Sequence, residues 1–275
     1  MPNTGSSPTV SGNVVYIVSN DGKLQAFNAA GCGRATCTPL WTGSIGGTSG
    51  DGAPAVANGV VYVTSGSRLF AFPAGGCGRA TCSPTWRSIA AAGFIQHSGP
   101  TVDNGNVYFA SVNFSGPNGT VSTVYAFPAA GCGAFTCRPR WVAHPADGDG
   151  IESTLAVANG VLYATATGFL YAFNANGCGR SVCGFLWLGI LDGMVAGSRS
   201  SPTVAAGVVY FVQNNGHIGA FDARGCGART CVQIWSAITQ DFDALLATPV
   251  IVDGRLYAAG PAFAQRPSIY VYHLV

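Results

Sequence analysis

Short apolar runs separated by glycine or asparagine turns repeat along the whole chain. Each repeat opens with Ser-Pro-Thr-Val or a relative of it, and continues with a glycine and an apolar run ending on tyrosine. A third run places an aromatic residue five positions before a cysteine, and a fourth begins with tryptophan, at Trp41, Trp86, Trp141, Trp187 and Trp235. Such runs, rich in β-branched and aromatic residues, predict antiparallel strands. We find no useful stretch with the 3.6-residue periodicity of an amphipathic helix.

The spacing of the repeats indicates the architecture. Successive tryptophans lie 45, 55, 46 and 48 residues apart, a period typical of solenoids and propellers. Radial repetition of four-stranded meanders gives a β-propeller. We therefore expect an all-β fold, a six-bladed β-propeller of four-stranded antiparallel blades in one domain spanning 1–275. The predicted blades cover approximately 7–52, 53–98, 99–152, 153–200, 201–246 and 247–275.

The sixth repeat is incomplete. It starts at Thr248 and runs through Tyr257 to Tyr272, which occupies the aromatic position of the other repeats, but neither cysteine nor tryptophan follows. The last blade is therefore expected to lack its outer strand. Both a chain trimmed from a longer protein and a thin closing blade fit this pattern.

All ten cysteines fall in five copies of a Gly-Cys-Gly-x-x-x-Cys motif or a close variant. The pairs are Cys32/Cys37, Cys77/Cys82, Cys132/Cys137, Cys178/Cys183 and Cys226/Cys231. An even number with none left over favours five local disulfides in an extracellular, periplasmic or cell-surface protein. Each would close a ring of about six residues at a solvent-exposed hairpin end and stabilise the fold by about 2 kcal/mol. A metal site, which needs four N or S ligands around one ion, and redox-active thiols are the alternatives.

Composition limits the possible partners and routes. Only 9% of residues are charged, 48% are hydrophobic and the net charge is +2. These values give no global attraction to nucleic acid, and no run of 18 apolar residues predicts a transmembrane segment. The first ten residues lack the basic and apolar regions of a secretion signal. Either a leader has been removed or export follows another route.

Charged residues are sorted along the repeat. Seven of the twelve arginines flank the cysteines, and seven of the eleven acids lie in connectors between repeats. In a propeller these two kinds of loop lie on opposite faces, so we expect a basic face and an acidic face. Two interpretations of the basic set stand: it meets an anionic partner such as a wall polymer, an acidic glycan or another subunit, or it only keeps the protein soluble. The arginines are Arg34, Arg79, Arg138, Arg140, Arg180, Arg224 and Arg229; the acids are Asp51, Asp147, Asp149, Glu152, Asp192, Asp241 and Asp243.

Two smaller groups are candidate ligand sites. Asp147, Asp149 and Glu152 carry oxygen atoms suited to Ca²⁺, although a flexible polar connector also explains them. Asp51, His97 and Arg199 each stand three residues before the proline position of their repeat. They are therefore predicted to face the central channel, where they would bind a small polar ligand or water.

No catalytic residue is predicted. The four histidines occupy non-equivalent positions in different repeats, and neither a nucleophile elbow, nor a phosphate loop, nor metal-ligand spacing accompanies them. Two insertions, 113–123 and 260–268, lengthen the connection between the second and third strands of repeats three and six. We expect both to be projecting loops.

The repeats resemble a known propeller family. Residues 24–29, 170–175 and 218–223, which read Leu-Gln-Ala-Phe-Asn-Ala and its variants, are similar to the PQQ-like repeats of quinoprotein alcohol dehydrogenases and of the bacterial outer-membrane assembly scaffold lipoprotein. For the dehydrogenases the resemblance implies eight blades, an adjacent Cys-Cys pair over the quinone, and a Glu, Asn and Asp set on calcium. This chain has no adjacent cysteines and one glutamate, Glu152, so we expect no PQQ cofactor.

The sequence thus favours a non-catalytic, exported binding or assembly-scaffold propeller. The expected partner is a protein or an anionic glycan or wall polymer, with no nucleic acid; self-assembly remains open. Two alternatives stand beside this interpretation: a subunit or decoration of a surface filament, and a fragment of a quinone-dependent dehydrogenase.

Overall fold

The protein is described by a computed structural model that covers residues 6–46, 52–95, 97–116, 119–146, 149–191, 198–239, 248–259 and 268–274. In these ranges 27 strands form six β-sheets. They contain no helix with the length and hydrophobicity needed to cross a membrane. The chain divides into two compact units, Met1–Val112 with Val124–Arg140, and Asn113–Thr123 with Trp141–Val275. Each unit is described by itself.

The first unit holds two complete sheets and most of a third. In each sheet consecutive strands pair as an antiparallel meander, as predicted. The first sheet contains β1 (Thr9–Ser11), β2 (Val14–Ser19), β3 (Lys23–Asn28), β4 (Trp41–Ser44) and β8 (Thr81–Cys82). The second contains β5 (Ala55–Ala57), β6 (Val60–Ser65), β7 (Arg68–Pro73), β9 (Trp86–Ser88) and β13 (Thr136–Cys137). The third begins with β10 (Thr101–Asp103), β11 (Asn106–Gly116) and β12 (Gly119–Pro128).

The second unit continues the same pattern. A short parallel pair joins β14 (Trp141–Ala143) to β18 (Val182–Cys183). The fourth sheet contains β15 (Ala156–Ala158), β16 (Val161–Ala166), β17 (Phe169–Asn174), β19 (Trp187–Ile190) and β23 (Thr230–Val232). The fifth contains β20 (Thr203–Ala205), β21 (Val208–Val212), β22 (His217–Asp222) and β24 (Trp235–Ile238), and the sixth β25 (Val250–Val252), β26 (Arg255–Ala259) and β27 (Ile269–His273).

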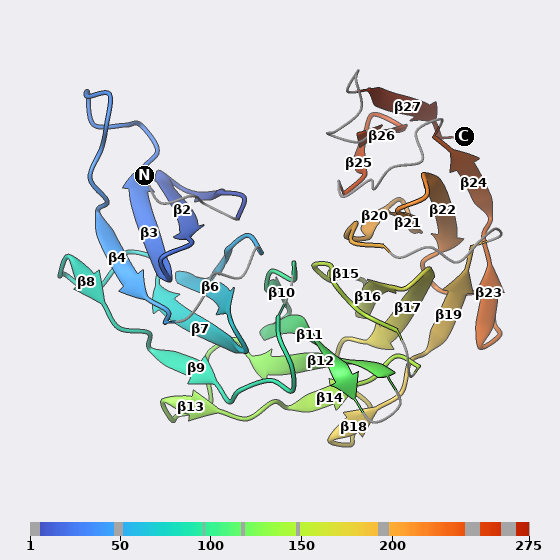
Figure 1. Ribbon diagram of the computed structural model, residues 1–275, viewed down its shortest axis with the longest axis horizontal. Helices are drawn as coiled ribbons and strands as arrows, with labels where there is room; N and C mark the ends of the chain where they lie inside the picture. Colours follow the sequence, from blue (N-terminus) through green and yellow to red (C-terminus); the bar gives the residue numbers. More distant parts are fainter. Residues whose placement is uncertain are drawn as a thin grey trace. The chain divides into compact units, whose positions relative to one another are not determined.

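Four sheets carry a fifth strand that the sequence did not predict. In the second to fifth repeats, the second half of the cysteine motif forms a strand of two or three residues that pairs in parallel with the tryptophan strand of the preceding repeat (Figure 1). The Thr42 amide donates to the Ala80 carbonyl at 2.8 Å, and Leu188 donates to Arg229 at the same distance. Strands this short show no alternation of polar and apolar residues, so the sequence carries no signal for them. Each of these four cysteine motifs therefore fastens its own repeat to the previous one.

A tryptophan and a glycine meet at the same junctions. Trp41, Trp86, Trp141 and Trp187 are each only 4% exposed, and each is covered by the glycine that precedes the first cysteine of the next motif. A Cβ added to that glycine would lie 2.5 to 2.8 Å from the indole Cδ1. No side chain fits in so small a space, which explains why the motif begins with glycine. The covering residues are Gly76, Gly131, Gly177 and Gly225.

Tyrosines complete the packing between successive sheets, as expected from the sequence. The Tyr16 hydroxyl donates to the Ala74 carbonyl at 2.9 Å, and Tyr163 donates to the Ala223 carbonyl at 2.6 Å. Burial raises the pKa of Tyr163 to about 12, so it remains a donor at neutral pH. The apolar core lies between neighbouring sheets, where clusters combine residues of two repeats.

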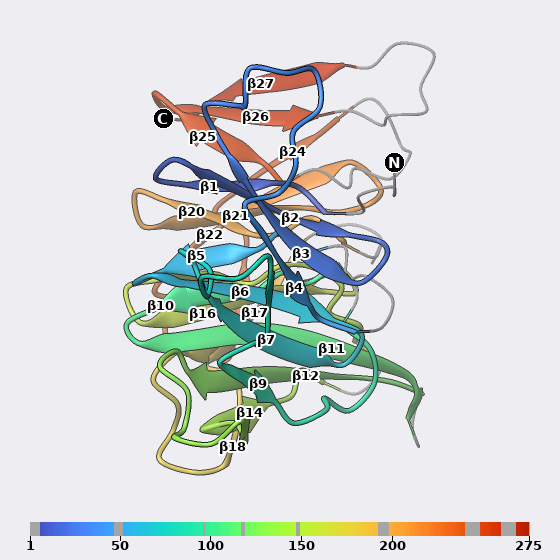
Figure 2. The ribbon, with the colours of Figure 1, turned by 90° about the vertical axis from the view of Figure 1, so that its left-hand side faces the viewer.

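Two features depart from a regular repeat. The insertion at 113–123, predicted to be a loop, instead lengthens β11 and β12, which run side by side as a long hairpin (Figure 2). Thr120, Val121 and Thr123 of its second arm are β-branched residues that favour a strand, which allows the ladder to continue. The other insertion, 260–268, lies outside the described residues except for Ser268. The sixth sheet has three strands in the described part of the chain, as predicted for a blade without its outer strand.

Candidate functional site: a cationic groove on the second repeat

The five predicted disulfides are confirmed. Each joins the two cysteines of one motif, with Cα atoms 5.6 to 5.8 Å apart and no free cysteine in the described residues. We call the five segments 31–37, 76–82, 131–137, 177–183 and 225–231 the Cys loops. Disulfides of this kind are typical of proteins that mature outside a reducing compartment.

The sequence predicts that these disulfides are exposed to solvent, and this prediction is wrong for the second cysteine of four of them. The first cysteine of every motif is exposed, but the second cysteine of four motifs is at most 7% exposed. The cause is the short parallel strand, which carries that cysteine into the packing between two repeats. One such cysteine lies in the core cluster of Trp41 and another in that of Trp187. The buried cysteines are Cys82, Cys137, Cys183 and Cys231.

The seven arginines assigned to the basic face are all exposed, but three of them are engaged within the chain. Arg224 forms an ion pair with Asp222 at 2.9 Å. Hydrogen bonds from the Arg224 side chain and backbone lower the pKa of Asp222 to about 2. Arg140 donates to the Asn106 side chain at 2.8 Å, and the Arg229 guanidinium lies 4.5 Å from the centre of the Phe185 ring.

The structure divides these arginines between the two units. Arg34, Arg79, Arg138 and Arg140 belong to the first unit, and Arg180, Arg224 and Arg229 to the second. Of the matching acids, Asp51, Asp147, Asp192, Asp241 and Asp243 lie outside the described residues. The predicted separation into a basic and an acidic face therefore stays a prediction.

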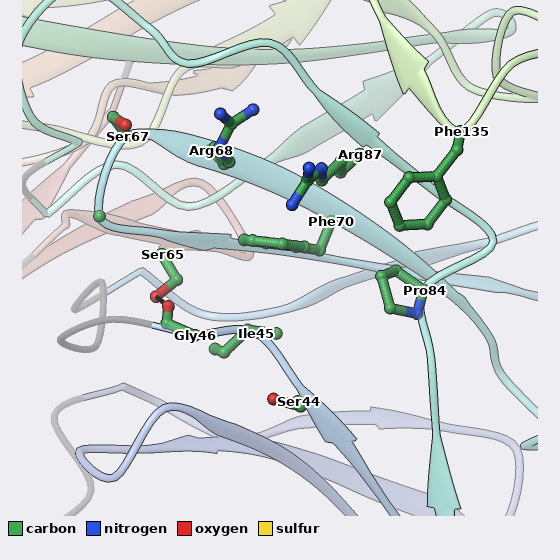
Figure 3. Close-up of a pocket in the computed structure, with 11 residues that line it drawn as sticks. Ser44, Ile45, Gly46, Ser65, Ser67, Arg68, Phe70, Pro84, Arg87 and Phe135 are labelled. Carbon is green, nitrogen blue, oxygen red and sulfur yellow. Dashed lines mark hydrogen bonds between the residues drawn. The ribbon is translucent and has the colours of Figure 1, made fainter.

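A groove of about 510 Å³ in the first unit brings together two other arginines that the sequence analysis did not single out. Arg68 and Phe70 project from the same face of β7, because alternate residues of a strand point the same way. Arg87 of β9 is the direct partner of Phe70 in the sheet register. Phe135 and Pro84 border the groove near Arg87, and Ser65 and Gly46 lie at its other side (Figure 3). We call this the blade-two groove.

The two guanidinium groups of the groove make hydrogen bonds to uncharged oxygen atoms. Arg68 donates to the Ser88 carbonyl at 2.7 Å, and Arg87 donates to the Thr136 hydroxyl at 3.4 Å. The Arg87 guanidinium also lies 5.1 Å from the centre of the Phe135 ring, a cation–π contact. No ion pair joins either arginine to a carboxylate of the described ranges. These contacts orient the groups without neutralising them, so the groove favours an anion.

The arginine pair of the groove occurs in the second repeat alone. The position of Arg68 holds Lys23, Thr123, Phe169 and His217 in the other complete repeats, and the position of Arg87 holds Thr42, Val142, Leu188 and Ser236. A signal was therefore present in the sequence, as two arginines that replace mostly uncharged residues. Only the strand register shows that these residues, 19 positions apart, lie on one face.

The remaining candidate residues do not form a described site. Of the proposed channel group, Asp51 lies outside the described residues, and His97 and Arg199 belong to different units. Arg199 donates to Glu152 at 2.7 Å. Of the proposed calcium ligands, Asp147 is also outside the described residues, and Asp149 is buried and accepts a hydrogen bond from the Tyr171 hydroxyl. No group of three His, Cys, Asp or Glu residues suited to a metal ion occurs in the described ranges.

The residues of this chain do not fit a PQQ site. The family resemblance implies two adjacent cysteines over the quinone, but all ten cysteines here are bonded across five positions within Cys loops. It also implies a glutamate on calcium, and the one glutamate, Glu152, is paired with Arg199. We therefore derive no quinone chemistry for this chain.

Comparison with known proteins supports the fold and leaves the activity open. No known family matches the sequence, and no curated protein matches it. Among solved structures, the computationally designed Ika8 protein is similar with a TM-score of 0.69 and 12% identity over 98% of this chain and 70% of that chain. BamB from Moraxella catarrhalis has a TM-score of 0.62 and 16% identity, covering 94% and 80% of the two chains.

Dehydrogenases are also among the similar structures. Quinohemoprotein alcohol dehydrogenase from Comamonas testosteroni has a TM-score of 0.62 and 15% identity, covering 86% of this chain and 43% of its own. The related enzyme ADHIIG from Pseudomonas putida HK5 has a TM-score of 0.64 and 15% identity, covering 92% and 50%. This chain thus spans about half the length of these enzymes. With six meander sheets and these neighbours, the fold is a six-bladed β-propeller, and its last blade has three strands in the described residues.

Proposed function

We propose that this propeller is a non-catalytic, exported binding module that holds an acidic polysaccharide through arginine side chains. The observation that carries the proposal is the blade-two groove, where Arg68 and Arg87 converge without a carboxylate partner among the described residues. Arginine binds carboxylate and sulfate groups through two parallel hydrogen bonds, which adds geometric selectivity to the charge.

The rest of the groove favours a sugar chain. Ser67 and Ser44 supply small hydroxyl groups beside it, and Phe135 is 51% exposed at its edge. An exposed aromatic ring offers an apolar face, and hydroxyls offer hydrogen bonds, which together suit an amphipathic sugar ring. Exposed Arg34, Arg79 and Arg138 in the same unit would add weaker contacts.

Calorimetric titration with polygalacturonate and with heparin fragments would test this proposal. For R68S/R87S we expect a loss of affinity of about a hundredfold or more, because each charge-assisted hydrogen bond contributes about 1.5–3 kcal/mol and at least two are lost. Binding by the parent should also weaken with salt, since the partners are charged. Arg255→Ser is the matched control, because Arg255 is exposed on β26 of the other unit.

The outcomes separate the candidate surfaces. Unchanged affinity in R68S/R87S with loss in an R34S/R79S/R138S variant would move the site to the Cys loops. Binding of neither polymer by the parent, or binding that survives both sets of substitutions, would contradict the proposal. Equal binding of poly-glutamate would indicate an acidic protein segment as partner.

A further inference from the structure

The tryptophan strand of the fifth repeat lacks the cover that the four earlier ones have. Among the described residues, no strand lies on the outer side of β24, whereas β4, β9, β14 and β19 each pair there with the strand of a Cys loop. Trp235 is half-buried, although its four equivalents are 4% exposed. Beside it, Ile234 is 62% exposed and Ile238 is 55% exposed. The fifth repeat therefore presents an uncovered acceptor for a Cys loop.

The first Cys loop shows the complementary deficiency. Its residues 31–37 form no strand, although the equivalent residues of the other four loops do. A Cβ on Gly31 would meet nothing within 4 Å, whereas its equivalents Gly76 and Gly225 press on a tryptophan. Cys37 is half-buried, but the second cysteines of the other loops are at most 7% exposed. This loop is closed by a disulfide like those of the others, but it pairs with no tryptophan strand of the described residues.

We propose that the first Cys loop of one copy of this chain binds β24 of a second copy. The four observed junctions fix the register. The residue after the tryptophan lies opposite the residue before the second cysteine, as in Thr42 with Thr81. By that register Ser236 lies opposite Thr36, and the Ser236 amide donates to the Ala35 carbonyl of the second copy. Gly31 then covers Trp235.

The chemistry of both surfaces fits this occupant. The sequence of β24, Trp-Ser-Ala-Ile, carries no charge, although exposed edge strands are usually protected by charge or proline. The Tyr272 hydroxyl already donates to the Ile238 carbonyl at 3.4 Å, and the Ser236 amide is the position at which Thr42, Arg87, Val142 and Leu188 donate to a Cys loop. Thr36 matches Thr81, Thr136 and Thr230 of the docked loops.

The contact is heterologous, because it joins two different surfaces. After pairing, the pair as a whole keeps one unused loop and one unused edge, so association continues head to tail into an open or closed chain of copies. The contact involves one short strand and one ring, which is small for a stable complex. We therefore expect association that rises with protein concentration.

Two single substitutions remove the two surfaces separately. Gly31→Ala places a Cβ against Trp235 of the other copy, so the loop can no longer bind. Ser236→Pro removes the outward amide, so the β24 edge can no longer accept a loop. Light scattering should show mass increasing with concentration for the parent, and monomers for each variant. A mixture of the two variants should form one-to-one pairs that grow no further, because each pair contains one intact loop and one intact edge.

Controls keep the result interpretable. Gly33→Ala carries the same backbone strain, with φ of +71° against +78° and nothing within 4 Å, and should associate like the parent. Ser236→Ala keeps the amide and should also associate. Ile238→Lys provides a second edge variant if Ser236→Pro unfolds. A parent that stays monomeric at every concentration, a Gly33→Ala variant as defective as Gly31→Ala, or mixed variants that do not pair would overturn the proposal.

Discussion

The glycine before each first cysteine has two constraints that can be separated by experiment. Gly76 and Gly31 occupy the same repeat position and share a φ of +78°, which disfavours any side chain. A Cβ on Gly76 would lie 2.6 Å from Trp41, whereas a Cβ on Gly31 would meet nothing. Only Gly76 is therefore limited by packing as well as by backbone conformation.

We expect Gly76→Ala to lower the free energy of unfolding by about 1–3 kcal/mol more than Gly31→Ala, since inserting a methyl group into a packed contact costs that much. Urea unfolding at a protein concentration low enough to keep both variants monomeric would measure the difference. Equal losses would mean that backbone strain alone explains the glycine, and that the tryptophan adjusts without cost.

Asp149 links stability to pH at a second residue. Its carboxyl is buried and accepts a hydrogen bond from Tyr171, and burial raises its pKa above the usual value despite that bond. The folded chain then holds the proton more tightly than the unfolded chain. The resulting stabilisation is present in acid and is lost as the pH rises through the folded-state pKa.

Asp149→Asn should therefore raise the melting temperature at neutral pH by a few degrees, and by less in acid where the parent carboxyl is already protonated. Thermal unfolding across the acidic to neutral range would show this convergence. Asp253→Asn is a suitable control, because Asp253 is exposed in a turn with φ of +48°, which asparagine tolerates. A variant destabilised equally at every pH would show that the carboxylate is needed for the Tyr171 contact.

At the scale of elements, the sequence predicts what depends on local periodicity. The meander strands are predicted because each combines β-branched and aromatic residues between turns, as in Val60–Ser65. The fifth strands are missed because Thr81–Cys82 and its equivalents have two or three residues and gain their pairing from another repeat. The same motif was recognised as a disulfide loop, while its role between repeats depends on contacts about 40 residues away in sequence.

The blade-two groove illustrates the same limit for a site. The substitution of arginine at two repeat positions is visible in the sequence, but nothing local shows that Arg68 and Arg87 share a face. Their proximity follows from the register that places Phe70 opposite Arg87. The Cys-loop arginines, which are easy to see in the sequence, include three that contact their own chain.

For the whole molecule, the disulfides are expected to decide whether the fold is stable. Each closes a loop of about six residues and contributes about 2 kcal/mol by loop entropy, so five independent loops contribute about 10 kcal/mol. The total stability of a folded domain is about 5–15 kcal/mol. The loops lie in five different repeats, so their effects should add. The contribution of the five disulfides is therefore comparable with the total stability of the domain.

We therefore expect the fully reduced chain to be largely unfolded near physiological temperature, or to unfold at a much lower urea concentration than the oxidised chain. Tryptophan fluorescence with and without a phosphine reductant would follow unfolding, and intact mass after alkylation would confirm ten thiols. Because four of the Cys loops also supply a strand to the neighbouring repeat, reduction should loosen the junctions between repeats before the meanders themselves. A reduced, alkylated chain within about 2 kcal/mol of the oxidised one would show instead that packing between sheets, and not the loops, carries the stability.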